Sequence, residues 1–217
     1  MRDAAVFVVS LSALAYEILL ARCFAVSQWH HLAFMVISVA LFGFGASGTV
    51  LSLLDARRPG WERRMSRPEA LGRLLCLFTL TAVAAFILVN RLPLDYARLP
   101  FQPIQALYLL TAFLALALPF GVAGTVVSVA YAAAAERTGR TYLATLWGSA
   151  LGAVLPAVAL PFFGEGNLVL GVALLPLIVV LWTGGRANRA VSLLLAGGIA
   201  LLPAVWPDAA QVTPSPY

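Results

Sequence analysis

The chain has 217 residues, of which 62% are hydrophobic and 11% are charged, and its mean hydropathy is +0.94. Because a soluble domain carries about 25% charged residues, this composition excludes an ordinary soluble globular protein. The formal net charge is +5, and all 14 basic residues are arginines. These arginines gather in short connections between apolar stretches, where arginines set membrane topology, so we expect no nucleic-acid partner.

Apolar stretches of roughly 20 residues recur along the whole chain, which is the length a helix needs to cross about 30 Å of hydrocarbon. They predict an all-α fold, a polytopic transmembrane helix bundle of about seven spans in a lipid bilayer. We expect one transmembrane helical domain over residues 1–206 and a short C-terminal tail at 207–217, with no soluble domain. The predicted spans are residues 4–26, 31–54, 71–90, 104–134, 142–163, 168–182 and 190–206.

The arginines are concentrated in alternate connections between these spans. The connection at 55–70 contains five, and two each follow the fourth and sixth spans, whereas the opposite connections contain only Arg91 and Arg98. Since arginine-rich connections stay in the cytoplasm, we expect a multi-pass protein whose N-terminus, with Arg2, is cytoplasmic. Seven spans then place Tyr217 on the outside.

One carboxylate, Glu17, lies well inside the first predicted span. It belongs to a narrow helical stripe whose other members are small, so Glu17 is predicted to face other helices and not lipid. The stripe consists of Ser10, Ala13, Glu17 and Ala21. An unpaired charge in the bilayer costs roughly 3 kcal/mol or more, which makes Glu17 a candidate binding residue. The alternative is a protonated or hydrogen-bonded glutamate that fixes helix packing.

The partner of Glu17 is predicted to lie on another helix. Arg22 is the basic residue closest in sequence, but a separation of five residues corresponds to about 140° around a helix, so the two side chains diverge. Arg22 lies near the outer end of the span, where its long side chain extends toward the lipid headgroups. The candidate partners of Glu17 are therefore polar residues of other spans, such as Tyr108, Thr111 and Asn90.

The two histidines, His30 and His31, follow Trp29 at the predicted outer boundary of the membrane. Adjacent side chains point about 100° apart on a helix, so they do not chelate one metal ion as an i, i+4 pair does. Interfacial polar residues are the main interpretation, and a haem ligand or proton relay, each needing one histidine, is the alternative. We expect no metal site and no cofactor.

The second span contains the glycine-dense segment 43–49. Small residues, among them Gly45, Ser47 and Gly48, lie on two sides of this helix, and small residues let neighbouring backbones approach closely in membranes. We therefore expect the second span to occupy the centre of the bundle, contacted by several helices. The functional alternative is a hinge or a cavity lined by backbone.

Two segments of the chain match each other in sequence. Residues 44–52 and 120–128 are identical at six of nine positions, which indicates an internal repeat of the kind found in transporters. The fifth span carries a further stripe of small residues at four-residue spacing, which is typical of close helix packing. That stripe consists of Ala144, Gly148 and Gly152.

The order of these motifs resembles one protein family. Tyr16-Glu17 with Arg22, then Trp29-His30-His31, then segment 43–49 is similar to the start of the bacterial membrane-embedded spermidine-synthase-like (polyamine aminopropyltransferase-like) proteins. The likeness continues through Leu118-Pro119-Phe120 with Ala123-Gly124, and through Tyr142 followed by segment 148–152. It implies the family's N-terminal membrane region, which is distantly similar to a transporter half and lies in the inner (plasma) membrane.

Two departures limit what the resemblance implies. Thr145 stands where an acidic residue is expected, and the family's aminopropyltransferase-like domain, with its catalytic residues, is not in this chain. The resemblance therefore implies an enzyme only when the chain is fused to such a domain or partnered with it. We identify no catalytic residues. The candidate binding residues are Tyr16, Glu17, Arg22, His30, His31, Gly45, Ser47 and Gly48.

Three functions are compatible with these observations. The first is a membrane module that anchors an aminopropyltransferase-like domain or protein, or exchanges a substrate with it. The second is a transporter of a polyamine or another small cation that uses Glu17, and its small size favours a homodimer. The third is a structural subunit of a membrane complex, in which His30 or His31 holds a cofactor.

Overall fold

The structure is a computed structural model that describes residues 2–27, 30–57, 60–94, 99, 101–134 and 138–205. These residues form an all-α helix bundle, which confirms the predicted fold class. The predicted tail at 207–217 lies outside the described residues. The helices are α1 (Arg2–Ser27), α2 (His30–Arg57), α3 (Trp61–Met65), α4 (Pro68–Arg91), α5 (Pro103–Ala132), α6 (Thr138–Phe163), α7 (Glu165–Thr183) and α8 (Arg186–Val205).

Each predicted span coincides with one long helix, and every helix begins earlier than predicted. The additional first residues include Pro68, Thr138 and Arg186, which a search for apolar stretches omits although their backbone is already helical. Among the described residues, six helices are long and apolar enough to cross a membrane, namely α1, α2, α4, α5, α6 and α7. The helix at the seventh predicted span, α8, is not one of these six. The bundle fits a multi-pass membrane protein.

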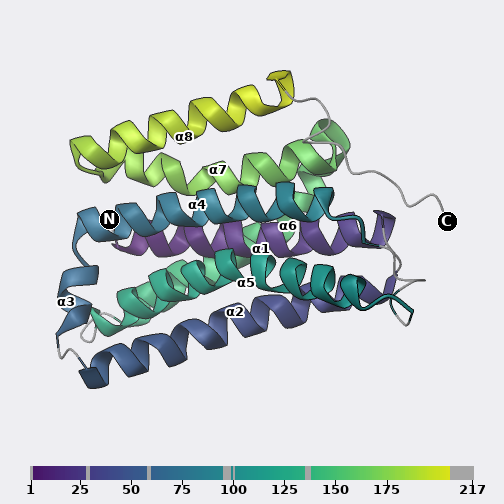
Figure 1. The fold of residues 1–217 in the computed structure, drawn as a ribbon. Coiled ribbons are helices and arrows are strands. Elements are labelled where there is room, and N and C mark those ends of the chain that lie inside the picture. Colours follow the sequence, from purple (N-terminus) through teal and green to yellow (C-terminus); the bar gives the residue numbers. More distant parts are fainter. Residues whose placement is uncertain are drawn as a thin grey trace.

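The central helix is α1 (Figure 1). It packs against α6, α7, α2 and α5, while α8 lies at one edge beside α7 and α2 lies at the opposite edge beside α5. The prediction that the second span is central is therefore wrong. Small residues allow close approach on any face they occupy, but α2 exposes large apolar side chains on the rest of its surface, including Phe34, Leu41 and Leu53.

Buried hydroxyl groups connect α1, α4 and α7 through the apolar interior. Tyr16 is 0% exposed, and its hydroxyl donates a hydrogen bond to the Ala82 carbonyl oxygen of α4 at 2.8 Å. The Thr79 hydroxyl of α4 donates to the Ala173 carbonyl oxygen of α7 at 2.7 Å. Such bonds hold helices together where burial from water gives no driving force, so they fix the order of the three helices around the core.

Two helix crossings depend on glycine. A Cβ atom on Gly148 of α6 would collide with the Phe7 carbonyl oxygen of α1, and a Cβ on Gly152 would collide with that of Leu11. The stripe predicted on the fifth span therefore packs directly on α1. On the other side of the bundle, a Cβ on Gly43 of α2 would lie 2.9 Å from the Gly121 nitrogen of α5.

This second crossing brings together the two segments that match in sequence. Phe44 and Phe120 occupy equivalent positions of the match, and their ring centroids are 6.4 Å apart. Ser47 faces Gly124, whose added Cβ would collide with the serine hydroxyl. Because α2 and α5 run in the same direction (Figure 1), the matching segments form a parallel pair in contact.

Polar contacts at the helix ends place the arginine-rich connections together. Arg2 donates from Nη1 to the Ala133 carbonyl oxygen at 2.7 Å, and Arg140 forms an ion pair with Asp3 at 2.8 Å. The Asn188 amide of α8 donates to the Glu69 carbonyl oxygen at 2.8 Å. The starts of α1, α4, α6 and α8 and the end of α5 therefore lie at one end of the bundle, which we call the arginine-rich end.

Candidate functional site

A cavity of about 150 Å³ lies between α1, α2, α5 and α6. Its residues come from all four helices, and half of them come from the stripe side of α1. The prediction that this stripe faces other helices is thus confirmed. The lining residues are Ser10, Ala13, Leu14, Glu17, Phe44, Val127, Thr145 and Ser149.

The glycine crossings explain why the cavity exists. Gly148 and Gly152 hold α6 against α1, which directs the neighbouring hydroxyl residues Thr145 and Ser149 toward the stripe of α1. The crossing of α2 with α5 places Phe44 on the other side of the same space. Because α2 packs on α5 and α6 packs on α1, these two outer helices stay apart and the cavity remains between them.

Among the described residues, Glu17 is the only ionisable residue that lines the cavity. Its side chain is half-buried, and within the described residues its carboxylate makes no hydrogen bond or ion pair. Thr145 donates its hydroxyl to the Thr141 carbonyl oxygen at 3.0 Å, which leaves its own oxygen free to accept. The cavity therefore offers one carboxylate, three hydroxyl groups and the Phe44 ring, and no basic side chain.

The carboxylate lies deep along the bundle. Glu17 follows the start of α1 by fifteen residues, which corresponds to about 22 Å along a helix of 26 residues. Glu17 is therefore close to the middle of α1, whose length of about 39 Å exceeds the roughly 30 Å of a hydrocarbon layer. A cation held there would interact with the carboxylate in surroundings of low polarity, where electrostatic attraction is stronger than in water.

Arg22 binds a residue that the sequence analysis did not consider. Its Nε atom lies 3.1 Å from Oε1 of Glu165, the first residue of α7, and its side chain is 58% exposed. Arg22 therefore does not pair with Glu17, as the helical spacing predicted. The sequence contained a signal for this contact. Glu165 is the one acidic residue between the fifth and sixth predicted spans, and Arg22 lies near the end of the first predicted span, on the same side of the membrane.

The partners predicted for Glu17 on other helices are wrong. In the part of the chain that the structure describes, Tyr108, Thr111 and Asn90 make no hydrogen bond to Glu17. The Thr111 hydroxyl instead donates to the Leu107 carbonyl oxygen of its own helix, and the Asn90 amide nitrogen is buried without a partner. The prediction failed because Asn90 belongs to α4, which does not line the cavity, and because Tyr108 and Thr111 precede Val127, the α5 residue at the cavity, by several helical turns.

Most of the other predicted binding residues lie away from the cavity. Tyr16 is in the core, and the Ser47 hydroxyl donates to the Phe44 carbonyl oxygen at 2.7 Å while packing on α5. Gly45 and Gly48 have no atoms within 4 Å of an added Cβ and lie on the open face of α2. The side chains of His30 and His31 lie outside the described residues.

Thr145 and Ser149 line the cavity but were not predicted as site residues. Both were visible as hydroxyl residues at four-residue spacing, beside Gly148 on the same helix. Phe44 lies in the glycine-dense segment 43–49, but it was not predicted as a binding residue. A more useful signal is the combination of a small-residue stripe with adjacent hydroxyl groups, because the stripe determines which face of the helix approaches its neighbour.

No group of three or more metal-binding side chains that could hold an ion occurs among the described residues. Comparisons with protein-family models, with curated proteins and with solved structures find no match for this chain. The function proposed below therefore depends on the geometry of the Glu17 cavity and on the sequence motifs.

Proposed function

We propose that this chain is an integral membrane module that binds a small cationic molecule at Glu17. The observation that carries the proposal is a carboxylate in the middle of the bundle, beside a cavity, with no partner among the described residues. An unpaired charge at this depth costs roughly 3 kcal/mol or more. A bound cation offsets that cost, and three hydroxyl groups are available to accept hydrogen bonds from it.

The lining favours an organic ammonium group as the cation. Calcium and magnesium need about six or more oxygen ligands, usually from several carboxylates, whereas this cavity has one carboxylate. An ammonium group donates hydrogen bonds to a carboxylate and to hydroxyl oxygens, and it is attracted to the face of an aromatic ring. Glu17, Thr145 and Phe44 provide these three kinds of contact. The motif order of the first two spans points further to polyamines.

The role proposed for the module is to serve an aminopropyltransferase-like domain or protein. It either anchors that partner at the bacterial inner membrane or exchanges a polyamine with it, and the partner supplies the catalysis. Support comes from the resemblance of residues 16–52 to the start of spermidine-synthase-like membrane proteins, together with the cation-binding character of the cavity. In this arrangement the arginine-rich end faces the cytoplasm, following the positive-inside rule.

A second candidate function, a transporter of small cations, is favoured by the contact between the matching segments of α2 and α5. Transporters are often built from repeats that bind their substrate near the middle of the membrane. Prolines within the long helices, such as Pro119, Pro156 and Pro176, provide places where a span can bend. A bundle of this size is small for a transporter, so this function implies a homodimer.

The test of the proposed site is a substitution that removes only the charge. We expect the purified chain in lipid nanodiscs to bind radiolabelled spermidine, and Glu17→Gln to weaken this binding at least roughly tenfold, as expected for a lost charged hydrogen bond. Glu165→Gln is the matched control because it changes another glutamate that lies outside the cavity. Equal affinity in Glu17→Gln and the unmodified chain would contradict the proposal.

Proteoliposomes separate the module from the transporter. Uptake of spermidine by vesicles that contain this chain alone, abolished by Glu17→Gln, identifies a transporter. Binding without uptake, together with capture of an aminopropyltransferase-like protein, identifies the module. A chain that binds no polyamine and purifies only with other membrane subunits would instead be a structural subunit.

A further inference from the structure

A second and larger cavity, of about 380 Å³, lies at the arginine-rich end of the bundle. This volume is in the range of small-molecule pockets, roughly 300–1,000 Å³. It lies between the start of α1 and the start of α4, and none of its residues belongs to the Glu17 cavity. The lining residues are Arg2, Ser66, Arg67, Pro68 and Leu71.

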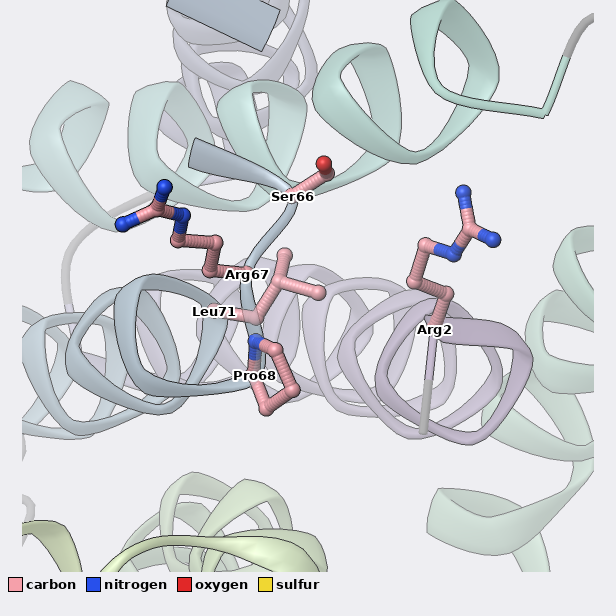
Figure 2. Close-up of a pocket in the computed structure, with 5 residues that line it drawn as sticks. All are labelled: Arg2, Ser66, Arg67, Pro68 and Leu71. Carbon is pink, nitrogen blue, oxygen red and sulfur yellow. The ribbon is translucent and has the colours of Figure 1, made fainter. Parts of the chain in front are cut away.

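The two arginines reach the cavity from different helices (Figure 2). Arg2 is the first residue of α1, and Arg67 is the N-cap residue of α4. Figure 2 shows the two guanidinium groups on opposite sides of the pocket, with the Ser66 side chain between them. Pro68 and Leu71 lie below and form an apolar floor.

Among the residues that the structure describes, no side chain neutralises the positive charge of this cavity. Within the described residues the Arg67 side chain makes no hydrogen bond or ion pair, and Arg2 uses one donor, Nη1, on the Ala133 carbonyl oxygen. The nearby carboxylate of Asp3 is paired with Arg140, and Glu69 does not line the cavity. The N-terminus of α4 adds a partial positive charge from its backbone dipoles.

We propose that this cavity binds a phosphate group, and that the group belongs to an anionic phospholipid of the leaflet at the arginine-rich end. Guanidinium groups bind phosphate oxygens through paired, charge-assisted hydrogen bonds, and this cavity presents one guanidinium group on each side. Basic pockets between membrane helices commonly hold lipid headgroups. The apolar floor of Pro68 and Leu71 then contacts the glycerol and the first part of an acyl chain.

The proposal is tested with the full chain in phosphatidylcholine nanodiscs, with phosphatidylglycerol added and bound lipid counted by native mass spectrometry. We expect preferential binding of phosphatidylglycerol. Arg67→Gln lowers the affinity roughly tenfold, since one charged hydrogen-bonding group is lost, and the double variant Arg2→Gln/Arg67→Gln removes the preference. The single variant is expected to fold because the Arg67 side chain is exposed and makes no hydrogen bond or ion pair with the described residues.

The control removes two charges elsewhere at the same end. Arg57→Gln/Arg186→Gln changes residues at the end of α2 and the start of α8, both exposed and outside the cavity. This control variant is expected to keep its preference for phosphatidylglycerol. Loss of preference in both double variants would overturn the proposal, because it would show a response to net charge and not to the pocket.

Soluble phosphates distinguish the source of the group. Glycerol phosphate and inorganic phosphate are added separately to the same nanodiscs. If either one competes with phosphatidylglycerol, and the lipid binds more tightly, the phosphate is the recognised group and a lipid supplies it. If inorganic phosphate binds through Arg67 but phosphatidylglycerol does not, the lipid source is overturned. If neither binds in a way that depends on Arg67, the phosphate site itself is overturned.

Discussion

Two segments with nearly the same sequence, residues 44–52 of α2 and 120–128 of α5, experience different surroundings in this bundle. Phe120 is 0% exposed and Val126 is 0% exposed, whereas the equivalent Phe44 and Val50 are 37% and 54% exposed. The difference arises from neighbours, because α5 packs against α2, α4 and α1, while α2 packs mainly against α5 and α1.

The comparison shows what a glycine-dense motif specifies in a membrane. It specifies that one helix approaches another closely, as α2 and α5 do through Gly43 and Gly121. It does not specify how many helices approach, since Gly45 and Gly48 face no other part of the described bundle. The number of neighbours depends on the order in which the whole chain packs, which a local pattern does not contain.

Substitution of the aromatic residues is expected to give the largest difference in stability loss between the two segments. Phe120→Ala is expected to lower the free energy of unfolding by about 3 kcal/mol, because it leaves a cavity among well-packed neighbours. One of those neighbours is Tyr16, whose ring centroid is 5.9 Å from that of Phe120. Phe44→Ala is expected to cost about 1 kcal/mol. Unfolding in mixed micelles of increasing SDS content measures both values, and equal losses would contradict the difference in burial.

Substitution of the glycines by valine is expected to give the next largest difference in stability loss. A side chain at position 124 meets Ser47 and the Phe44 backbone, so Gly124→Val is expected to destabilise the bundle by about 2 kcal/mol through overpacking. A Cβ atom added at the equivalent Gly48 has nothing within 4 Å, so Gly48→Val is expected to change stability by less than about 0.5 kcal/mol. The same SDS titration compares them. A large loss in Gly48→Val would mean that another helix covers this face of α2.

The sequence was sufficient to predict the helices and the orientation of Glu17. Span lengths follow from the thickness of the hydrocarbon layer, and the stripe that contains Glu17 follows from the geometry of a single helix. The gathering of arginines at one end follows from the alternation of spans. Each of these features depends on one element at a time, so local patterns determine it.

The sequence was not sufficient to predict what surrounds Glu17. Thr145 and Ser149 reach the cavity only because Gly148 and Gly152 select α1 as the neighbour of α6. The pairing of Arg22 with Glu165 likewise depends on the start of α7 lying beside the end of α1. These features depend on pairs of helices far apart in the chain, and many pairings are compatible with the same apolar lengths and small-residue stripes.

A smaller effect is expected from the hydroxyl group of Tyr16, whose ring packs against Phe120 of the buried segment. Tyr16→Phe keeps the ring against Phe120 but removes the hydrogen bond to the Ala82 carbonyl oxygen. Hydrogen bonds between membrane helices contribute about 0.6 kcal/mol on average, so a loss of this size is expected in the SDS titration. Tyr16→Ala is the comparison, and it should cost several times more because packing on Phe120 is also lost.

The smallest effect is expected from the threonines, which should not distinguish the two segments at all. Thr125 donates its hydroxyl to the Gly121 carbonyl oxygen at 2.8 Å, and the equivalent Thr49 donates to the Gly45 carbonyl oxygen at 3.2 Å. Both bonds lie within one helix, so Thr125→Ala and Thr49→Ala are each expected to change stability by less than about 0.5 kcal/mol. A larger loss in Thr49→Ala, measured by the same titration, would show that the open face of α2 contacts protein and not lipid. The difference in burial between the two segments would then hold only for the isolated chain, because α2 would be buried against another protein in a larger assembly.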